Sequence, residues 1–534
     1  MRRKRIAYVA ATAALAVACF ALAGCSSDAR NDSAVGTSGE TATKEERSLA
    51  ESPAPAADRA ATEGEASPAS EEPMAPPYGK PSRPAPPPNG QDDMYFDHAG
   101  TNPFVATEDD PLSTFAIDVD TGSYTVVRNY VAGGSLPPED AVRVEEFVNY
   151  FEPDYAPPKD QAFAVHVDGG PSPFGEGYEL LRIGLKGREV ADEDRKPANL
   201  TFVIDVSGSM DRDNKLGLVK QSLRLLVDSL KSSDQIAIVA YGSDARIVLD
   251  PVSLEDKRDI EDAIDALASS GSTNAEEGLR LAYEVAERQY SRDAVNRVIL
   301  LSDGVANVGE TSAEGILETI DEYANTKRIT LTTVGFGMGN YNDALMEQLA
   351  DQGDGVYAYV DSFTEARRLF VENVAGTLET IARDAKIQVE FDPEAVDRYR
   401  LLGYENRDIR DEDFRDDETD AGEVGAGHTV TALYEVKLKS PEARKAIGTA
   451  RVRYVDEKTN RTEEWTVPLR TEGELSEDLK FLAAVAEYAE ILRGSYWAKE
   501  SSIEAVLDLA ERAAEDEREQ QFVTMVKDTA ALRR

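Results

Sequence analysis

The stretch from Leu200 to Ser209 reads LTFVIDVSGS and changes from an apolar run to a polar turn at Asp205. A continuous run such as Leu200 to Ile204 is typical of a strand that is buried on both faces of a parallel sheet. Strand-like and helix-like segments alternate from here onward, so we predict a doubly wound α/β domain over residues 198–382. Ligands of such sheets bind at the carboxyl ends of the strands, where Asp205, Ser207 and Ser209 fall.

The elements of this α/β domain follow from the spacing of apolar residues. The expected strands are 200–205, 235–241, 245–249, 296–302, 328–335 and 355–360. The expected helices are 215–230, 274–290, 312–326, 343–351 and 363–382.

Two later segments bring further oxygen-bearing side chains to the same edge of the sheet. Gly271-Ser272-Thr273-Asn274 opens a helix, and an apolar strand ends in Ser302-Asp303-Gly304. Two carboxylates with several hydroxyls make a plausible octahedral site for Mg²⁺ that keeps one position open. No imidazole or thiolate is near in sequence, which argues against zinc. Each of these segments alone is weak evidence for a metal site, because the same residues often form only a turn and a helix N-cap.

The ordered combination resembles the metal-ion-dependent adhesion site (MIDAS) of von Willebrand factor type A (VWA) domains. The matching residues are Asp205, Ser207, Ser209, Thr273 and Asp303. The resemblance covers about residues 198–380 and implies that Thr273 is a switchable ligand and that Asp303 completes the site directly or through water. It implies Mg²⁺, or Mn²⁺ or Ca²⁺, as the ion. The alternative is a degenerate domain that keeps only the turn chemistry.

The flanking segments resemble bacterial lipoproteins that embed a VWA domain between an N-terminal associated segment and a C-terminal domain of unknown function. The segments that carry this likeness are 113–155, 403–407 and 420–428. We expect 92–160 to be a small α/β unit of its own, with helices near 123–131 and 142–150.

The remaining alternating segments lie on both sides of the VWA domain. They are 163–167, 178–185, 385–391, 429–438, 447–455 and 463–469. We therefore predict a β-sandwich, built from 161–197 and 383–472, into which the α/β domain is inserted. Residues 473–534 are expected to form an amphipathic helical pair, with Trp497 and Phe522 as core anchors.

The N-terminus carries the features of a secreted lipoprotein. Basic residues precede an apolar run that ends in Leu22-Ala23-Gly24-Cys25, which resembles a lipobox, so 1–24 is expected to be a signal peptide and Cys25 the site of lipidation, by palmitate or a similar chain. The other cysteine, Cys19, lies inside the removed segment. An ordinary cleavage site with an incidental cysteine is the alternative. Residues 25–91, rich in Pro, Ala, Ser and Glu, predict a disordered tether.

Length and charge limit the partners. A chain of 534 residues predicts two to four folded units. Its net charge is −43, and removal of four basic residues with the signal peptide makes it −47. Such a surface repels nucleic-acid phosphates and anionic lipids, so we expect no nucleic-acid binding and membrane attachment through the acyl chain alone.

Three other motifs allow a functional and a structural interpretation. Asp120-Thr121-Gly122-Ser123 resembles half of an aspartic-protease site, but no second copy exists, so Asp120 or Ser123 is interpreted as a helix cap. The acidic segment 408–418 lacks the spacing of a calcium loop and is interpreted as a solvated loop. His428 is expected to form a structural hydrogen bond, since no Ser/His/Asp arrangement is visible.

Together these features predict a membrane-anchored, extracytoplasmic protein of the cell envelope that is not an enzyme. It is expected to bind a protein or surface polymer through the metal, with an acidic residue of the partner as the missing ligand. The alternative is a structural or assembly factor whose metal only stabilises the fold.

Overall fold

The computed structural model describes Phe96 and residues 98–304, 315–316, 327–337, 342–417, 419, 421–471 and 473–534. All of these fall within one unit, Ala75–Arg534. The predicted signal peptide, Cys25, the tether and most of the predicted helix 312–326 lie outside the described residues. Among the residues described, no helix is both long and apolar enough to cross a membrane.

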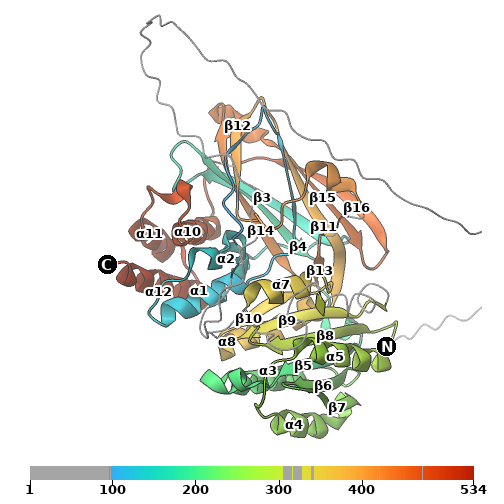
Figure 1. The fold of residues 1–534 in the computed structure, drawn as a ribbon. Coiled ribbons are helices and arrows are strands. Elements are labelled where there is room, and N and C mark those ends of the chain that lie inside the picture. The colour runs from blue at the N-terminus through green and yellow to red at the C-terminus, as the bar shows by residue number, and fades with distance from the viewer. Residues whose placement is uncertain are drawn as a thin grey trace, which may run out of the picture. The chain divides into compact units, whose positions relative to one another are not determined.

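A six-stranded sheet forms the centre of the α/β domain, in the order β10-β9-β8-β5-β6-β7 (Figure 1). Neighbouring strands are parallel except for β7, which is antiparallel to β6. The strands are β5 Ala198–Asp205, β6 Gln235–Tyr241, β7 Ala245–Ser253, β8 Val295–Ser302, β9 Thr330–Phe336 and β10 Tyr357–Val360. Every residue of β5 is buried, because helices cover both faces of the sheet. The predicted doubly wound fold is confirmed.

Helices α5 and α7 pack on one face of this sheet, and α3, α4, α8 and α9 pack on the other. Their bounds are α3 Lys215–Ser229, α4 Lys257–Ala266, α5 Ala275–Gln289, α7 Asp343–Asp351, α8 Phe363–Arg367 and α9 Val374–Leu378. The single helix predicted over 363–382 is wrong: a π-helical turn at Arg368–Glu372 separates α8 from α9, and β11 begins at Thr380.

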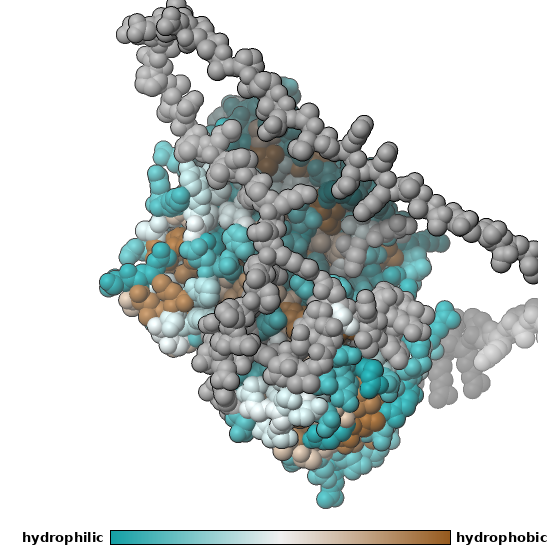
Figure 2. Space-filling model, viewed as in Figure 1, coloured by the Kyte–Doolittle hydropathy of each residue, from teal (hydrophilic) through white to brown (hydrophobic). Residues whose placement is uncertain are grey.

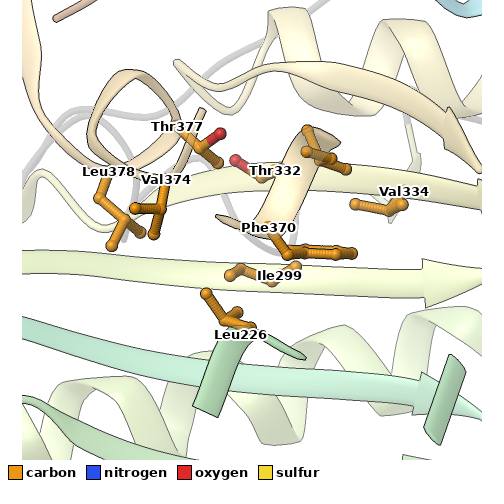
Figure 3. Close-up of a pocket in the computed structure, with 9 residues that line it drawn as sticks. Leu226, Ile299, Thr332, Val334, Phe370, Val374, Thr377 and Leu378 are labelled. Carbon is orange, nitrogen blue, oxygen red and sulfur yellow. The ribbon is translucent and has the colours of Figure 1, made fainter. Parts of the chain in front are cut away.

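A small apolar cavity of about 10 Å³ lies beneath this interrupted helix (Figure 3). Phe370 and Val374 face Ile299 across it, and its lining residues are apolar except for Thr332 and Thr377. The space is about enough for one water molecule, so we interpret it as a packing gap rather than a ligand site.

Two antiparallel sheets form the predicted sandwich, and the α/β domain is inserted between their β4 and β11 strands. The first sheet is β1 Val105–Ala106, β12 Val396–Leu402, β14 Thr429–Leu438, β4 Glu179–Gly187 and β3 Phe163–Pro171. The second is β13 Glu423–Gly425, β11 Thr380–Phe391, β15 Gly448–Asp456 and β16 Arg461–Leu469, with β2 Leu112–Ala116 paired to β11. A shared apolar core fills the space between them.

The N-terminal segment does not form a unit of its own, which corrects that expectation. Its strand β2 pairs with β11, and its helices α1 Gly122–Ala132 and α2 Val144–Tyr150 share a core with the C-terminal helices. Those are three helices rather than a pair: α10 Glu477–Leu492, α11 Ile503–Ala513 and α12 Glu517–Leu532. The predicted core anchor Phe522 is fully buried among them.

Buried arginines join the α/β domain to the rest of the structure. Arg143, before α2, pairs with Asp343 at 2.6 Å and Glu347 at 3.0 Å, both on α7. Arg407, after β12, lies 3.5 Å from the same Glu347. Because these side chains are shielded from water, the pairs fix the domain orientation more firmly than surface pairs would.

On the face shown in Figure 2, the coloured surface is mainly hydrophilic, with scattered apolar spots. The exposed large hydrophobic residues of the described part are Leu136, Ile247, Tyr290, Phe363, Tyr496 and Leu532. They are spread over separate elements, so they do not define a docking face.

Candidate metal centre

Three loops meet at the carboxyl edge of the six-stranded sheet. The amide of Gly208 donates to the carbonyl of Gly271 at 3.0 Å, and the amide of Ser270 donates to that of Val206 at 2.6 Å. Gly271 has φ +87°, and a Cβ there would lie 2.5 Å from Ser243 Oγ, so this turn requires glycine. The first two sequence-predicted segments are therefore held side by side by main-chain bonds.

Asp205 organises the first loop. One of its carboxylate oxygens accepts a 2.7 Å hydrogen bond from the amide of Ser207, and the other accepts one from Ser302 Oγ at 3.1 Å. The hydroxyls of Ser207 and Ser209 are 2.9 Å apart. Hydroxyl oxygens this close to each other and to a carboxylate form a compact set of hard ligands.

Asp303 lies just beyond the end of β8, the strand next to β5. It is fully buried, as is Asp205. Lys215, at the start of α3, donates from Nζ to Asp303 Oδ2 at 3.1 Å, and the second oxygen, Oδ1, is buried without a hydrogen-bond partner. A buried carboxylate oxygen without a partner is costly unless a cation or a water satisfies it.

The two carboxylates affect each other electrostatically. Burial, and then the nearby charge of Asp303, raise the pKa of Asp205 to about 7. Lys215 pairs with Asp303 but not with Asp205, so a further positive charge is favourable here. A cation at this place must compete with a proton for Asp205 near neutral pH.

Thr273 lies on the second loop and is 1% exposed. The residue after it, Asn274, caps α5 by accepting from the amide of Glu277 at 3.3 Å. The amide of Asn274 in turn donates to the carbonyl of Gly242, which follows β6. Main-chain bonds of Gly271 and Asn274, on either side of Thr273, thus hold this loop at the edge that carries Asp205.

The donor set fits a hard divalent ion. It consists of two carboxylates and three hydroxyls, which are oxygen ligands of the kind that Mg²⁺ prefers. In the described ranges no group of three or more His, Cys, Asp or Glu side chains is placed to share an ion, so the hydroxyls are essential to any coordination here. The sequence analysis did not assign Ser302 and Lys215, which contact the two carboxylates.

The other motifs lie elsewhere. The interpretation of Asp120 and Ser123 as helix caps is wrong: Asp120 accepts from Arg407 at 2.8 Å and from the amide of Tyr357 at 3.1 Å, and Ser123 donates to the carbonyl of Ala141. His428 is half-buried, and its imidazole forms no hydrogen bond within the described part of the chain, contrary to expectation.

The acidic segment is more structured than a solvated loop. Asp411 accepts from Thr114 at 2.5 Å, and Asp417 accepts from Arg453 at 2.6 Å. These acids therefore serve in part to hold the loop against the second sheet.

Comparison with known families agrees with this architecture. Residues 199–372 match the von Willebrand factor type A domain, 90–182 match a family described as von Willebrand factor, and 376–532 match the C-terminal domain of the uncharacterized protein YfbK. The chain is therefore a VWA-domain protein, a class that mediates protein interactions. It belongs to the YfbK family: it is 38% identical to YfbK of Escherichia coli K12 over 443 residues, which is 77% of this chain and 76% of that protein.

More distant relatives match less than half of this chain. A Synechocystis protein, sll0103, is 29% identical over 40% of this chain and half of its own length. The inter-alpha-trypsin inhibitor heavy chain H3 of Pongo abelii is 28% identical over 46% of this chain and 30% of its own length. Among solved structures, a von Willebrand factor type A protein from Catenulispora acidiphila covers 71% of this chain and 91% of its own, with a TM-score of 0.43 and 16% identity.

Proposed function

We propose that this chain is a lipid-anchored protein of the cell envelope that binds a partner through a divalent ion and catalyses no reaction. The proposed ligands are Asp205, Ser207, Ser209, Thr273 and Asp303. The observation that carries the proposal is the pair of fully buried carboxylates, Asp205 and Asp303, at the ends of neighbouring strands, of which Asp303 pairs with Lys215. Isolated buried acids are unfavourable, and a divalent ion offsets their charge.

The bound ion would supply a positive charge at a surface otherwise dominated by acids. A carboxylate of a protein or polymer partner is then the favoured ligand for an open coordination position. Ser207, Ser209 and Thr273 contribute neutral oxygens, so they hold the ion without cancelling its charge. Mg²⁺ is the expected ion, with Mn²⁺ or Ca²⁺ as alternatives.

Titration calorimetry of the purified protein with Mg²⁺, Mn²⁺ and Ca²⁺ tests the centre directly. We expect one ion to bind and to raise the melting temperature, because a ligand of the native state stabilises it. Asp205→Asn should lose this binding, whereas Asp250→Asn, on the exposed edge strand β7, should keep it. Saturating metal without heat or a shift in melting temperature would remove the proposal.

Partner capture from envelope extracts, with and without EDTA, separates the two candidate roles. We expect EDTA and Thr273→Ala to abolish capture, and Thr524→Ala, an exposed hydroxyl on α12, to leave it unchanged. Suppose that calorimetry shows metal binding but capture of the partner persists in EDTA. This result would favour the alternative, in which the chain is an assembly factor and the ion only stabilises its fold.

The anchor is tested separately. Cys25→Ser should release the protein from the membrane or leave it unprocessed, because the thiol is the only atom in the mature chain suited to this acylation. Wild type should partition into detergent. Equal partitioning of both proteins contradicts lipidation without affecting the metal centre.

A further inference from the structure

A cavity of about 390 Å³ lies where the sandwich, the N-terminal segment and the α/β domain meet. Its walls come from the β2–α1 turn at 118–121, from the region of β10 to α9, and from the glycine-rich turn between β13 and β14. None of the proposed metal ligands lines it. The volume is within the range of small-molecule sites, which often form where domains meet.

Two cations face this cavity. Lys186 donates from Nζ to the carbonyl of Gly427 at 2.8 Å and to Thr429 Oγ1 at 3.2 Å, and no described carboxylate lies within ion-pair distance of it. Neutral acceptors thus fix the position of this ammonium without neutralising it. That is unusual in a chain with a net charge of −43.

Arg368 is the second cation and belongs to the π-helical turn of the α/β domain. It donates from Nε to Glu365 at 2.6 Å and from Nη2 to Thr121 at 3.0 Å. Its Nη1 lies 3.7 Å from Glu152, which is beyond direct hydrogen bonding. The Nη1 group of the guanidinium can therefore donate to another anionic oxygen.

His428 provides a neutral polar group beside these cations. Burial lowers its pKa, and the charges of Lys186 and Arg368 act in the same direction, against that of Glu152. The imidazole is therefore uncharged near pH 7 and presents one N–H donor and one acceptor. Since it forms no hydrogen bond with another described residue, both are available to a bound molecule or to water.

The carboxylates of the lining differ in exposure and in partners. Asp118 and Asp120 lie in its less exposed part, where both pair with Arg407. The side chains of Glu152 and Glu372 are 36% and 49% exposed, whereas that of Arg368 is 10% exposed. Glu189 is also exposed. The cavity thus has two cations and the Arg407-paired acids toward its interior, and Glu152, Glu189 and Glu372 toward its rim.

We propose that this cavity binds a small zwitterion, an amino acid or dipeptide, with its carboxylate on Lys186 and Arg368 and its ammonium at the rim acids. His428 donates its N–H to the same carboxylate. A phosphate ester, with a larger negative charge, would meet repulsion from Glu152, Glu189 and Glu372, so a monocarboxylate matches the site better. The walls belong to different domains, so the ligand also ties them together.

Calorimetry and melting curves in EDTA, which keeps the metal centre out of the measurement, test this site on the full mature chain. The probes are L-alanine, L-alanyl-L-alanine, its C-terminal amide, its N-acetyl derivative and inorganic phosphate. We expect alanine or the dipeptide to bind, the amide to lose at least tenfold in affinity, and the N-acetyl form to lose less. Absence of binding by both zwitterions, or tighter binding of phosphate, overturns the proposal.

Variants locate the binding. Lys186→Met should lose at least tenfold in affinity for the dipeptide, Lys186→Arg should retain most of it, and Lys439→Met, an exposed lysine paired with Glu108, should bind as wild type does. Glu152→Gln should weaken binding of the dipeptide more than that of its N-acetyl form. Unchanged affinity in a folded Lys186→Met protein overturns the assignment, and equal effects of Glu152→Gln on both probes overturn the placement of the ammonium.

Discussion

Lys215 shows how one side chain adjusts the charge of the candidate metal centre. Its ammonium is buried, with 5% of the side chain exposed, and it lies 3.1 Å from an oxygen of Asp303. A divalent ion bound between Asp205 and Asp303 would be repelled by this charge or would have to displace it. The lysine therefore stabilises the metal-free protein and weakens metal binding.

We predict that Lys215→Met raises the affinity for Mg²⁺ by about tenfold or more, which corresponds to about 1.4 kcal/mol. The metal-free variant should melt at a lower temperature than wild type, because Asp303 loses its counter-charge, and saturating metal should remove this difference. Calorimetry and melting curves at pH 8 measure both effects. Lys220→Met, a half-buried lysine on the same helix that donates to the carbonyl of Asp265, is the control. Weaker metal binding in Lys215→Met would contradict this role.

A residue that contacts the site is hard to predict from the sequence when its side chain is of a type that is usually exposed to solvent. The carboxylates and hydroxyls of the candidate centre were predictable because each follows an apolar strand or opens a helix. Lys215 begins an amphipathic helix, where a lysine is ordinarily solvated. Only the fold brings it to Asp303, 88 residues later in the chain.

At the scale of elements, predictions succeeded where the apolar pattern is continuous. The strand Ala198–Asp205 is entirely buried and was predicted to within two residues. The strand Val396–Leu402 was missed, because Arg398 and Arg400 interrupt its apolar residues. Arg400 is nonetheless buried, since Glu435 and Glu490 pair with it from distant segments. Helix α4 was missed because only three of its residues are buried.

Helix α10 carries an acid that makes stability depend on pH. Burial raises the pKa of Glu487 to about 7, with further contributions from Glu490 and Glu435. Between about pH 4.5 and 7 the folded state then holds more protons than the unfolded chain, so stability falls as pH rises through this range. Above pH 7 the full cost of the buried charge is present.

We therefore predict that Glu487→Gln stabilises the protein at pH 8, by up to about 3 kcal/mol, and has little effect at pH 4.5. Chemical denaturation at the two pH values measures the difference. The control is Glu500→Gln, which replaces an exposed acid after the same helix. It should change the stability only slightly, and by the same amount at pH 4.5 and pH 8. A Glu487→Gln effect that does not grow with pH would contradict the raised pKa.

At the scale of the whole molecule, the arrangement of the parts depends on contacts between residues far apart in sequence. Phe151 packs on Phe481 with ring centroids 5.0 Å apart and on Phe522 at 5.8 Å. The sequence indicated that each of these segments is helical but not that they share one core. Periodicity is a local property, whereas this pairing of faces depends on the sandwich that brings both ends of the chain together.

Arg407 is the residue on which this arrangement depends most directly. It donates to Asp118 at 3.1 Å and to Asp120 at 2.8 Å, both from the N-terminal segment, and lies 3.5 Å from Glu347 of the α/β domain. Burial raises the pKa of Asp120, and the Arg407 charge opposes that rise. The arginine thus favours the ionised form of a buried acid at the junction of three parts of the chain.

We predict that Arg407→Met destabilises the protein by about 3–5 kcal/mol at pH 8, because the acids that face Arg407 are left without their counter-charge. Scanning calorimetry should show a lower melting temperature, and separate transitions would indicate that the α/β domain has lost its coupling to the sandwich. The double variant Arg407→Met/Asp120→Asn should recover part of the loss, since it removes one of the unpaired charges. Arg410→Met breaks an exposed ion pair three residues away and should show no resolvable change. If Arg407→Met melts as wild type does, the arginine does not hold the domains together, and the apolar cores alone determine their orientation.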